Sequence, residues 1–217
     1  DRYRLSDEAA MVFVDEDSPA FLAGGFEVLG ALYQDLDKVQ RAFTTGTGLG
    51  WHEHHPMLFS GTERFFRAGY KAHLVPEWIP ALGGVEEKLR KGARVADVGC
   101  GYGASTIVMA NAYPASRFVG FDYHPQSVET ARRRAAEAGV ADRVEFKVAG
   151  AKDYPGKDYD MVAFFDCLHD MGDPVGAGRH VRETLASDGT WMVVEPFAGD
   201  SVAENLNPVG RVYYAFS

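Results

Sequence analysis

Cysteine is scarce in this chain, and long apolar runs and blocks of basic residues are missing from it. The 217 residues include two cysteines, Cys100 and Cys167, which are too few for a disulfide framework and favour a reducing compartment. No stretch approaches the run of about 20 apolar residues that spans a bilayer. The first residues are polar and charged, unlike a secretory signal. We therefore expect a cytoplasmic protein with no membrane partner.

The charge balance is acidic, with a formal net charge of -9. Proteins that bind nucleic acid usually present a basic face to the phosphate backbone. The acidic balance therefore argues against nucleic acid as a partner and favours a small molecule.

From about residue 83, short apolar runs alternate with helical patterns. The runs are ARVADVG, SRFVGFD, RVEFKVAG, YDMVAFFD and GTWMVVEP. Apolar strands that alternate with helices indicate a parallel sheet covered on both faces. We predict a five-stranded, Rossmann-like, doubly wound α/β core over residues 81–217, preceded by a helical segment over residues 1–80.

Two start signals suggest where helices of the first segment begin. Ser18-Pro19 places a capping residue before a proline, which is typical of the first helical position. Ser60 and Glu63 form a capping-box pattern, which predicts that another helix begins there.

A glycine-rich turn, ADVGCGYGAST, lies between the first predicted strand and a predicted helix. Gly99 and Gly101 allow a tight turn and a close approach to a ligand, and the following helix N-terminus offers N–H groups to an anion. Residues 99–104 also fit the Gly-x-Gly-x-x-Ala pattern of a dinucleotide fold, so an NAD- or flavin-dependent oxidoreductase is one alternative.

Two acidic residues bear on the choice of cofactor. Asp97 precedes the glycines, where its carboxylate would repel a pyrophosphate and attract the ammonium of S-adenosylmethionine. Asp122 ends the second strand about 20 residues beyond the glycines, where a carboxylate accepts hydrogen bonds from both ribose hydroxyls of either cofactor. Tyr123 beside it could cover the adenine. These residues favour S-adenosylmethionine over a dinucleotide.

With these motifs, the sequence resembles the class I S-adenosylmethionine-dependent methyltransferases. VADVGCGYGAST is similar to their first motif, and FVGFDYHPQSVETARRRA to their second strand and helix. VEFKVAGAKDYP and YDMVAFFDCLHDMGDP resemble the third-strand turn and the fourth strand with its loop. The resemblance covers about residues 83–198 and implies a methyltransferase of class 2.1.1.

The resemblance also assigns further cofactor-binding residues. Cys100 belongs to the glycine turn, and Asp166 begins the loop after the fourth strand, near the methionine moiety. Many family members carry an acidic residue at the place of Gly150, near the adenine. Here a backbone group, or Ala151 and Lys152, has to serve.

A histidine suited to general base catalysis follows the fourth predicted strand. His169 lies in DCLHDMGDP, at the carboxyl end of the sheet, where ligands of such folds bind. A purely structural role in the loop is the alternative. CLHDMGDP and WMVVEPFAGD resemble small-molecule O-methyltransferases in which a glutamate orients the histidine. That likeness implies His169 as the base and Glu195 as its partner.

The stretch WHEHHP contains three histidines, but their spacing matches no zinc pattern, so we expect no metal. GWHEHHPMLFSGTERFFRAGYKAHL resembles helices that roof the substrate pocket. By that likeness Trp51, His54, His55 and Phe66 are the expected pocket residues.

The N-terminal residues resemble the end of a winged-helix dimerisation domain, which implies a homodimer. The chain begins inside that segment and ends before the last two strands of the usual sheet, so a fragment is one interpretation. Two functions stay open: methyl transfer to a small molecule, with a hydroxyl oxygen as the expected acceptor, and a cofactor-sensing transcriptional regulator that has lost catalysis.

Overall fold

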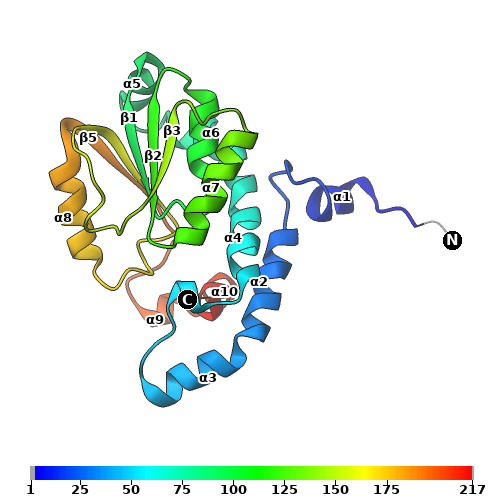
Figure 1. Ribbon diagram of the computed structural model, residues 1–217. Coiled ribbons are helices and arrows are strands. Elements are labelled where there is room, and N and C mark those ends of the chain that lie inside the picture. The colour runs from blue at the N-terminus through cyan, green and yellow to red at the C-terminus, as the bar shows by residue number, and fades with distance from the viewer. Residues whose placement is uncertain (1–2, 217) are drawn as a thin grey trace.

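The computed structural model describes residues 3–216, and helices alone form its N-terminal part (Figure 1). The elements of this part are α1 (Asp7–Phe13), α2 (Ala23–Gln34), α3 (Leu36–Thr45), the short 3-10 helix η1 (Trp51–Glu53), α4 (Pro56–Gly69) and the π-helix η2 (Tyr70–Trp78).

Strands and helices alternate in the rest of the chain. The elements are α5 (Val85–Lys91), β1 (Arg94–Val98), α6 (Ala104–Ala112), β2 (Arg117–Asp122), α7 (Pro125–Glu137), β3 (Val144–Val148), β4 (Tyr159–Phe165), α8 (Pro174–Thr184), β5 (Leu185–Val194), α9 (Val202–Asn205) and α10 (Pro208–Phe216).

The five strands form one parallel sheet in the order β3-β2-β1-β4-β5. The chain moves outward from β1 through β2 to β3, then crosses back to place β4 on the other side of β1. A crevice opens at such a reversal, outside the carboxyl ends of the two central strands, and ligands bind there in doubly wound folds. The predicted fold class is confirmed, and the five apolar runs of the sequence are the five strands.

Helices cover both faces of this sheet. Apolar residues of α5, α6, α7 and η2 pack on one face, and α8 packs on the other. The strands therefore bury side chains on both faces; in β1, four of the five residues are buried. A sheet buried in this way holds the ends of its strands rigidly, which is a suitable support for a binding site.

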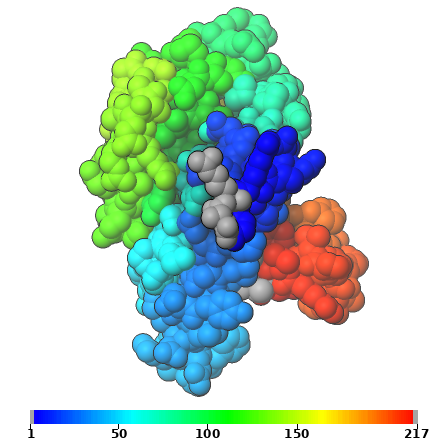
Figure 2. Space-filling view, turned by 90° about the vertical axis from the view of Figure 1, so that its right-hand side faces the viewer, coloured from blue at the N-terminus to red at the C-terminus, as the bar shows by residue number. Residues whose placement is uncertain are grey.

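Helices α2 and α4 cross at very short distance because each presents a glycine at the contact. A Cβ atom on Gly24 would lie 2.5 Å from the Phe65 nitrogen, and one on Gly61 would lie 2.8 Å from the Val28 nitrogen. Larger residues at these positions would force the helices apart. The crossing fixes α2 against α4. Figure 2 shows the C-terminal segment (red) at the lower right, beside the N-terminal segment (blue) that faces the viewer.

Polar and aromatic contacts attach this helical part to the core. The buried Glu63 carboxylate of α4 pairs with Arg134 of α7 at 2.6 Å. The Phe59 ring stacks on His124 with centroids 4.9 Å apart, and the His52 N–H donates to the Tyr123 hydroxyl at 3.2 Å. The N-terminal helices therefore lie against the edge where β2 ends.

Both expected helix starts are wrong. Helix α2 begins at Ala23 because the Ser18 hydroxyl accepts from the Ala20 N–H within a local turn. Helix α4 begins at Pro56, where the His55 ring caps the Met57 N–H, so Ser60 lies inside the helix. Across the described residues, we find no helix with the length and apolar character needed to cross a membrane.

Candidate cofactor and acceptor site

The glycine turn after β1 uses its glycines for different purposes. A Cβ on Gly99 would lie 2.7 Å from Cys167 Sγ, and one on Gly103 would lie 2.6 Å from the Phe146 ring. These two glycines allow internal packing. Gly101 has a φ of 51°, and an added Cβ would meet nothing within 4 Å. Gly101 is therefore the glycine of this turn that leaves room for a ligand, while the buried Cys100 packs inside the turn.

Asp97 lies at the centre of the site and is 1% exposed. Its Oδ2 accepts hydrogen bonds from the hydroxyls of Ser105 and Thr106, both at 2.6 Å, whereas its Oδ1 has no hydrogen-bond partner. Burial raises the pKa of Asp97 to about 6. A buried carboxylate oxygen without a partner is costly, and a cationic ligand group would relieve that cost.

Asp122, at the end of β2, holds the glycine turn in place. Its Oδ2 accepts from the Gly101 N–H at 2.9 Å, and its Oδ1 accepts from the His124 N–H at 2.8 Å. Burial raises the pKa of this carboxyl. Each oxygen of an ionised carboxylate has room for a second hydrogen bond, so a pair of ribose hydroxyls fits here. Tyr123 beside it is 49% exposed.

The turn after β3 contains the residues expected near the adenine. The Gly150 N–H donates to Asp153 Oδ1, and Ala151 packs in the apolar cluster beneath α8. The Lys152 ammonium donates to Asp173 Oδ2 at 3.1 Å, at the start of α8. The side chain of Lys152 is therefore directed toward α8 in this structure.

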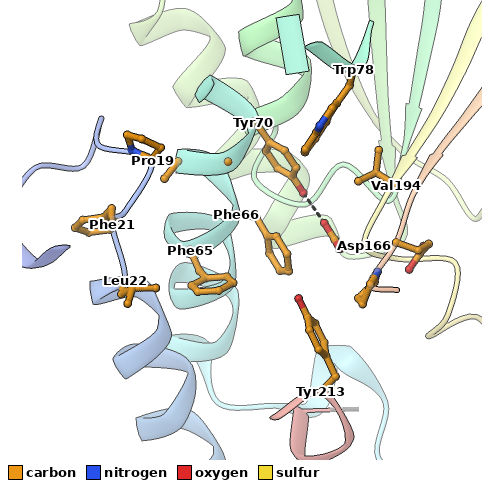
Figure 3. Close-up of a pocket in the computed structure, with 14 residues that line it drawn as sticks. Pro19, Phe21, Leu22, Phe65, Phe66, Tyr70, Trp78, Asp166, Val194 and Tyr213 are labelled. Atoms are coloured by element: carbon orange, nitrogen blue, oxygen red, sulfur yellow. Dashed lines mark hydrogen bonds between the residues drawn. The ribbon is translucent and has the colours of Figure 1, made fainter. Parts of the chain in front are cut away.

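Asp166 follows β4 with a φ of 50°, in the left-handed region that non-glycine residues rarely adopt. Its Oδ2 accepts from the Tyr70 hydroxyl at 3.1 Å (Figure 3). Burial raises the pKa of Asp166 to about 6, and the nearby Glu195 charge adds to the rise. No sequence motif indicates this contact of Tyr70, because it joins η2 to a loop 96 residues further along the chain.

His169 and Glu195 meet at the ends of the adjacent strands β4 and β5. Glu195 Oε1 accepts from the backbone N–H groups of Cys167 at 3.2 Å and Leu168 at 2.7 Å, and its Oε2 pairs with His169 Nδ1. His169 Nε2 lies 3.6 Å from Asp170 Oδ1. Burial lowers the pKa of His169, but the hydrogen bond to Glu195 and the neighbouring carboxylates outweigh burial and raise it.

A cavity of about 280 Å³ opens beside Asp166 and Glu195 (Figure 3). Phe66, one of the expected pocket residues, lines it. Tyr213 of α10 also reaches it, and burial together with the Asp166 charge raises the pKa of Tyr213. The lining residues are Pro19, Phe21, Leu22, Phe65, Phe66, Ala68, Gly69, Tyr70, Trp78, Asp166, Val194, Glu195, Pro196 and Tyr213.

The other three expected pocket residues do not line this cavity, because other contacts use their side chains. Trp51 packs in the small core between α2 and α4 and meets Phe59 edge-on at 5.4 Å. His54 Nδ1 lies 3.0 Å from the fully buried Asp35 carboxylate, and His55 caps α4. Within residues 3–216, no cluster of three histidine, cysteine or acidic residues could hold a metal ion.

Curated relatives are similar to part of this chain. One is a 27-O-demethylrifamycin SV methyltransferase of Amycolatopsis mediterranei, 34% identical over 57% of the chain and 48% of the relative. Another is a trans-aconitate 2-methyltransferase of Streptomyces avermitilis, 32% identical over 62% of the chain and 50% of the relative. The chain thus spans about half the length of these relatives.

Solved structures share the fold over nearly the whole chain. A candidate O-methyltransferase of Nostoc punctiforme PCC 73102 is 21% identical with a TM-score of 0.69, over 99% of this chain and 64% of that one. The mitomycin 7-O-methyltransferase MmcR is 17% identical with a TM-score of 0.65, over 97% and 62%. At these identities the likeness concerns the fold.

A family match agrees with the strand order and with the groups at the ends of β1 and β2. Residues 89–211, more than half of the chain, match the methyltransferase domain family. The orphaned Asp97 oxygen, the open space above Gly101 and the Asp122 carboxylate fit the ammonium and the ribose of S-adenosylmethionine, the cofactor of this family. The chain belongs to the class I S-adenosylmethionine-dependent methyltransferases.

Proposed function

We propose that the protein transfers a methyl group from S-adenosylmethionine to a hydroxyl oxygen of a small molecule, with His169 as general base. The observation that carries this proposal is the His169–Glu195 pair at the carboxyl end of the sheet. Glu195 lines the largely aromatic cavity, and His169 is held by Glu195 just outside that lining. A hydroxyl is a weak nucleophile until its proton leaves, and a positioned imidazole is suited to accept that proton.

The cofactor would be held by residues at the ends of β1, β2 and β4. The Asp97 carboxylate attracts the methionine ammonium, Asp166 lies beside the methionine moiety, Asp122 accepts from the ribose hydroxyls, and Tyr123 covers the adenine. Gly150 would lie at the adenine end, where its N–H donates to Asp153 Oδ1 in this structure. When bound, the cofactor supplies a methyl group carried on a positively charged sulfur.

The tautomer of His169 follows from its partner. The Glu195 carboxylate is an acceptor only, so the neutral imidazole donates from Nδ1 and leaves the lone pair of Nε2 for the hydroxyl proton. Once Nε2 is protonated, the Glu195 and Asp170 carboxylates stabilise the imidazolium. Glu195 is therefore a positioning residue, and His169 is the residue that receives the proton.

The N-terminal residues 1–80 would form one wall of the acceptor site, and residues 81–217 the cofactor-binding core. Pro19, Phe21 and Leu22 from the first part and Val194 from the second line the same cavity. The winged-helix likeness and the homodimer remain predictions that belong with this proposal.

The proposal is tested by mixing the protein with S-adenosylmethionine and a panel of phenols and measuring the S-adenosylhomocysteine released. His169→Ala should bind S-adenosylhomocysteine as the natural sequence does and lose turnover by about 10²–10⁴-fold. His180→Ala is the matched control, because that histidine lies on α8 with its Nε2 bound to the Tyr154 carbonyl. Full turnover in His169→Ala would remove the proposed base.

A further inference from the structure

The charges that surround the cavity determine which acceptors it can take. We propose that the cavity selects flat aromatic acceptors that are neutral or positively charged and excludes acceptors that carry a carboxylate or phosphate on the ring or on a short chain attached to it. This inference rests on the proposed function, because it concerns the acceptor of the same site.

The lining is aromatic and acidic. Of the lining residues, six are aromatic and two are acidic, and none of those described is lysine, arginine or histidine. Aromatic rings stack on flat ligands, and their faces attract cations. Figure 3 shows the rings of Phe65, Phe66 and Tyr70 around the open space, with Tyr213 entering from the opposite side.

The cations carried by the neighbouring helices are already paired. Arg64 and Arg67 of α4 both pair with Glu16, and Lys71 of η2 pairs with Asp17. The Arg64 guanidinium also lies 5.4 Å from the centre of the Phe21 ring, and Arg64 is not one of the residues that line the cavity. An anionic acceptor would have to break one of these pairs to gain a counter-ion.

The two acidic groups differ in what they offer a ligand. Both Glu195 oxygens are engaged, one by two backbone N–H groups and the other by His169. Asp166 uses its Oδ2 for the Tyr70 hydroxyl. Its other oxygen can accept from a hydroxyl or an ammonium group, whereas a carboxylate placed there would meet a like charge. Repulsion of wrong ligands contributes to specificity in addition to attraction of right ones.

The size of the cavity limits the acceptor as well. Its volume of about 280 Å³ lies just below the range of roughly 300–1,000 Å³ for small-molecule sites. An acceptor of one or two rings fits this space, with its reacting hydroxyl toward the end that Glu195 and Asp166 form.

Three phenols that share one ring and one two-carbon chain test the inference: 4-ethylphenol is neutral, tyramine is cationic and 3-(4-hydroxyphenyl)propionate is anionic. Their dissociation constants are measured by NMR titration on the complex with S-adenosylhomocysteine, so that turnover does not enter. We expect the neutral and cationic members to bind at least about tenfold more tightly than the anion.

A charge inserted at the edge of the cavity should reverse this order. Leu22 lines the cavity and is 48% exposed, and its hydrogen bonds to Val12 and Gly25 are made by its backbone, so a replacement of the side chain leaves them in place. In Leu22→Lys, we expect the affinity for the anion to rise at least about fivefold and the affinity for tyramine to fall. Leu22→Gln is the matched control of similar length, and it should keep the original order.

The possible outcomes distinguish a failure of the proposed function from a failure of the proposed acceptor selectivity. If S-adenosylhomocysteine fails to bind, the proposed function is wrong. If it binds and the anion binds as well as the neutral phenol, or none of the three phenols binds, the inference is wrong and the proposed function stands. If Leu22→Lys and Leu22→Gln change the three dissociation constants equally, the inference about acceptor charge is also wrong.

Discussion

The replacement Glu195→Gln is the most informative single change at the proposed catalytic pair, because it alters the tautomer of His169 with little change of shape. In the natural sequence, Oε1 accepts from the N–H groups of Cys167 and Leu168, and Oε2 pairs with His169 Nδ1. A glutamine has one acceptor oxygen and one NH₂ donor in the same places. Either the two backbone N–H groups or the Nδ1–H of His169 must therefore face the NH₂ donor instead of an acceptor oxygen.

The magnitude follows from counting the hydrogen bonds on each side. If the amide oxygen faces the two backbone N–H groups, its NH₂ donates to Nδ1, and the imidazole carries its proton on Nε2. If the amide turns around, two backbone donors lose their acceptor, which costs about 3 kcal/mol at about 1.5 kcal/mol each. The unproductive tautomer is then favoured by a factor of about 10²–10³, since every 1.36 kcal/mol is tenfold.

We therefore expect Glu195→Gln to lower kcat by about 10²–10³-fold and to leave S-adenosylhomocysteine affinity within about threefold. The His169 pKa, followed by NMR, should fall because a hydrogen bond that raises it is lost. Glu183→Gln, a change at an exposed position of α8, is the control. If Glu195→Gln keeps a third or more of the natural kcat, the tautomer argument is refuted.

Three further predictions concern pH, the buried carboxylate and the helix crossing. Because the base must be neutral and its pKa is raised above 6.5, kcat/KM should rise with pH through a midpoint above 6.5, and a midpoint below 6 would contradict this. The raised pKa of Asp97, about 6 in the fold against 3.8, means that its ionisation destabilises the protein as pH rises from 3.8 through 6. Asp97→Asn should therefore add about 1–3 kcal/mol of stability at pH 7, measured by thermal unfolding, and a loss of stability would contradict this prediction. The same variant should weaken S-adenosylhomocysteine binding at least about tenfold, measured by calorimetry. Gly61→Ala should cost about 1–3 kcal/mol and lower Tm by several degrees, whereas Gly69→Ala, where an added Cβ has nothing within 4 Å, should not.

The sheet could be predicted from the pattern of apolar runs, whereas the proposed His169–Glu195 pair is implied by the resemblance to O-methyltransferases and agrees with the strand order. Continuous apolar runs between helices imply parallel strands buried on both faces, and polar residues that follow such strands meet at one edge. His169 follows β4 and Glu195 follows β5, and these strands are neighbours in the sheet. Their contact depends on the strand order more than on the surrounding side chains.

The walls of the cavity could be predicted only in part, because Phe66 is the one expected pocket residue that lines it. Tyr70 reaches Asp166 from a π-helix, which has no clear sequence signal, and Tyr213 comes from a helix near the end of the described chain. Trp51 and His54 lie in a stretch rich in functional residue types, yet the apolar core between α2 and α4 and the buried Asp35 carboxylate take their side chains. Such contacts depend on how helices cross, and a one-dimensional pattern does not contain that information.

Calorimetric titration with S-adenosylhomocysteine tests most directly whether the ends of β1 and β2 hold the cofactor. We predict that one molecule binds per chain, that Asp122→Ala weakens binding at least about tenfold, and that NADH produces no heat of binding. Asp142→Ala, a change at an exposed residue paired with Arg143, should leave the titration unchanged. Binding of NADH without binding of S-adenosylhomocysteine would contradict the account.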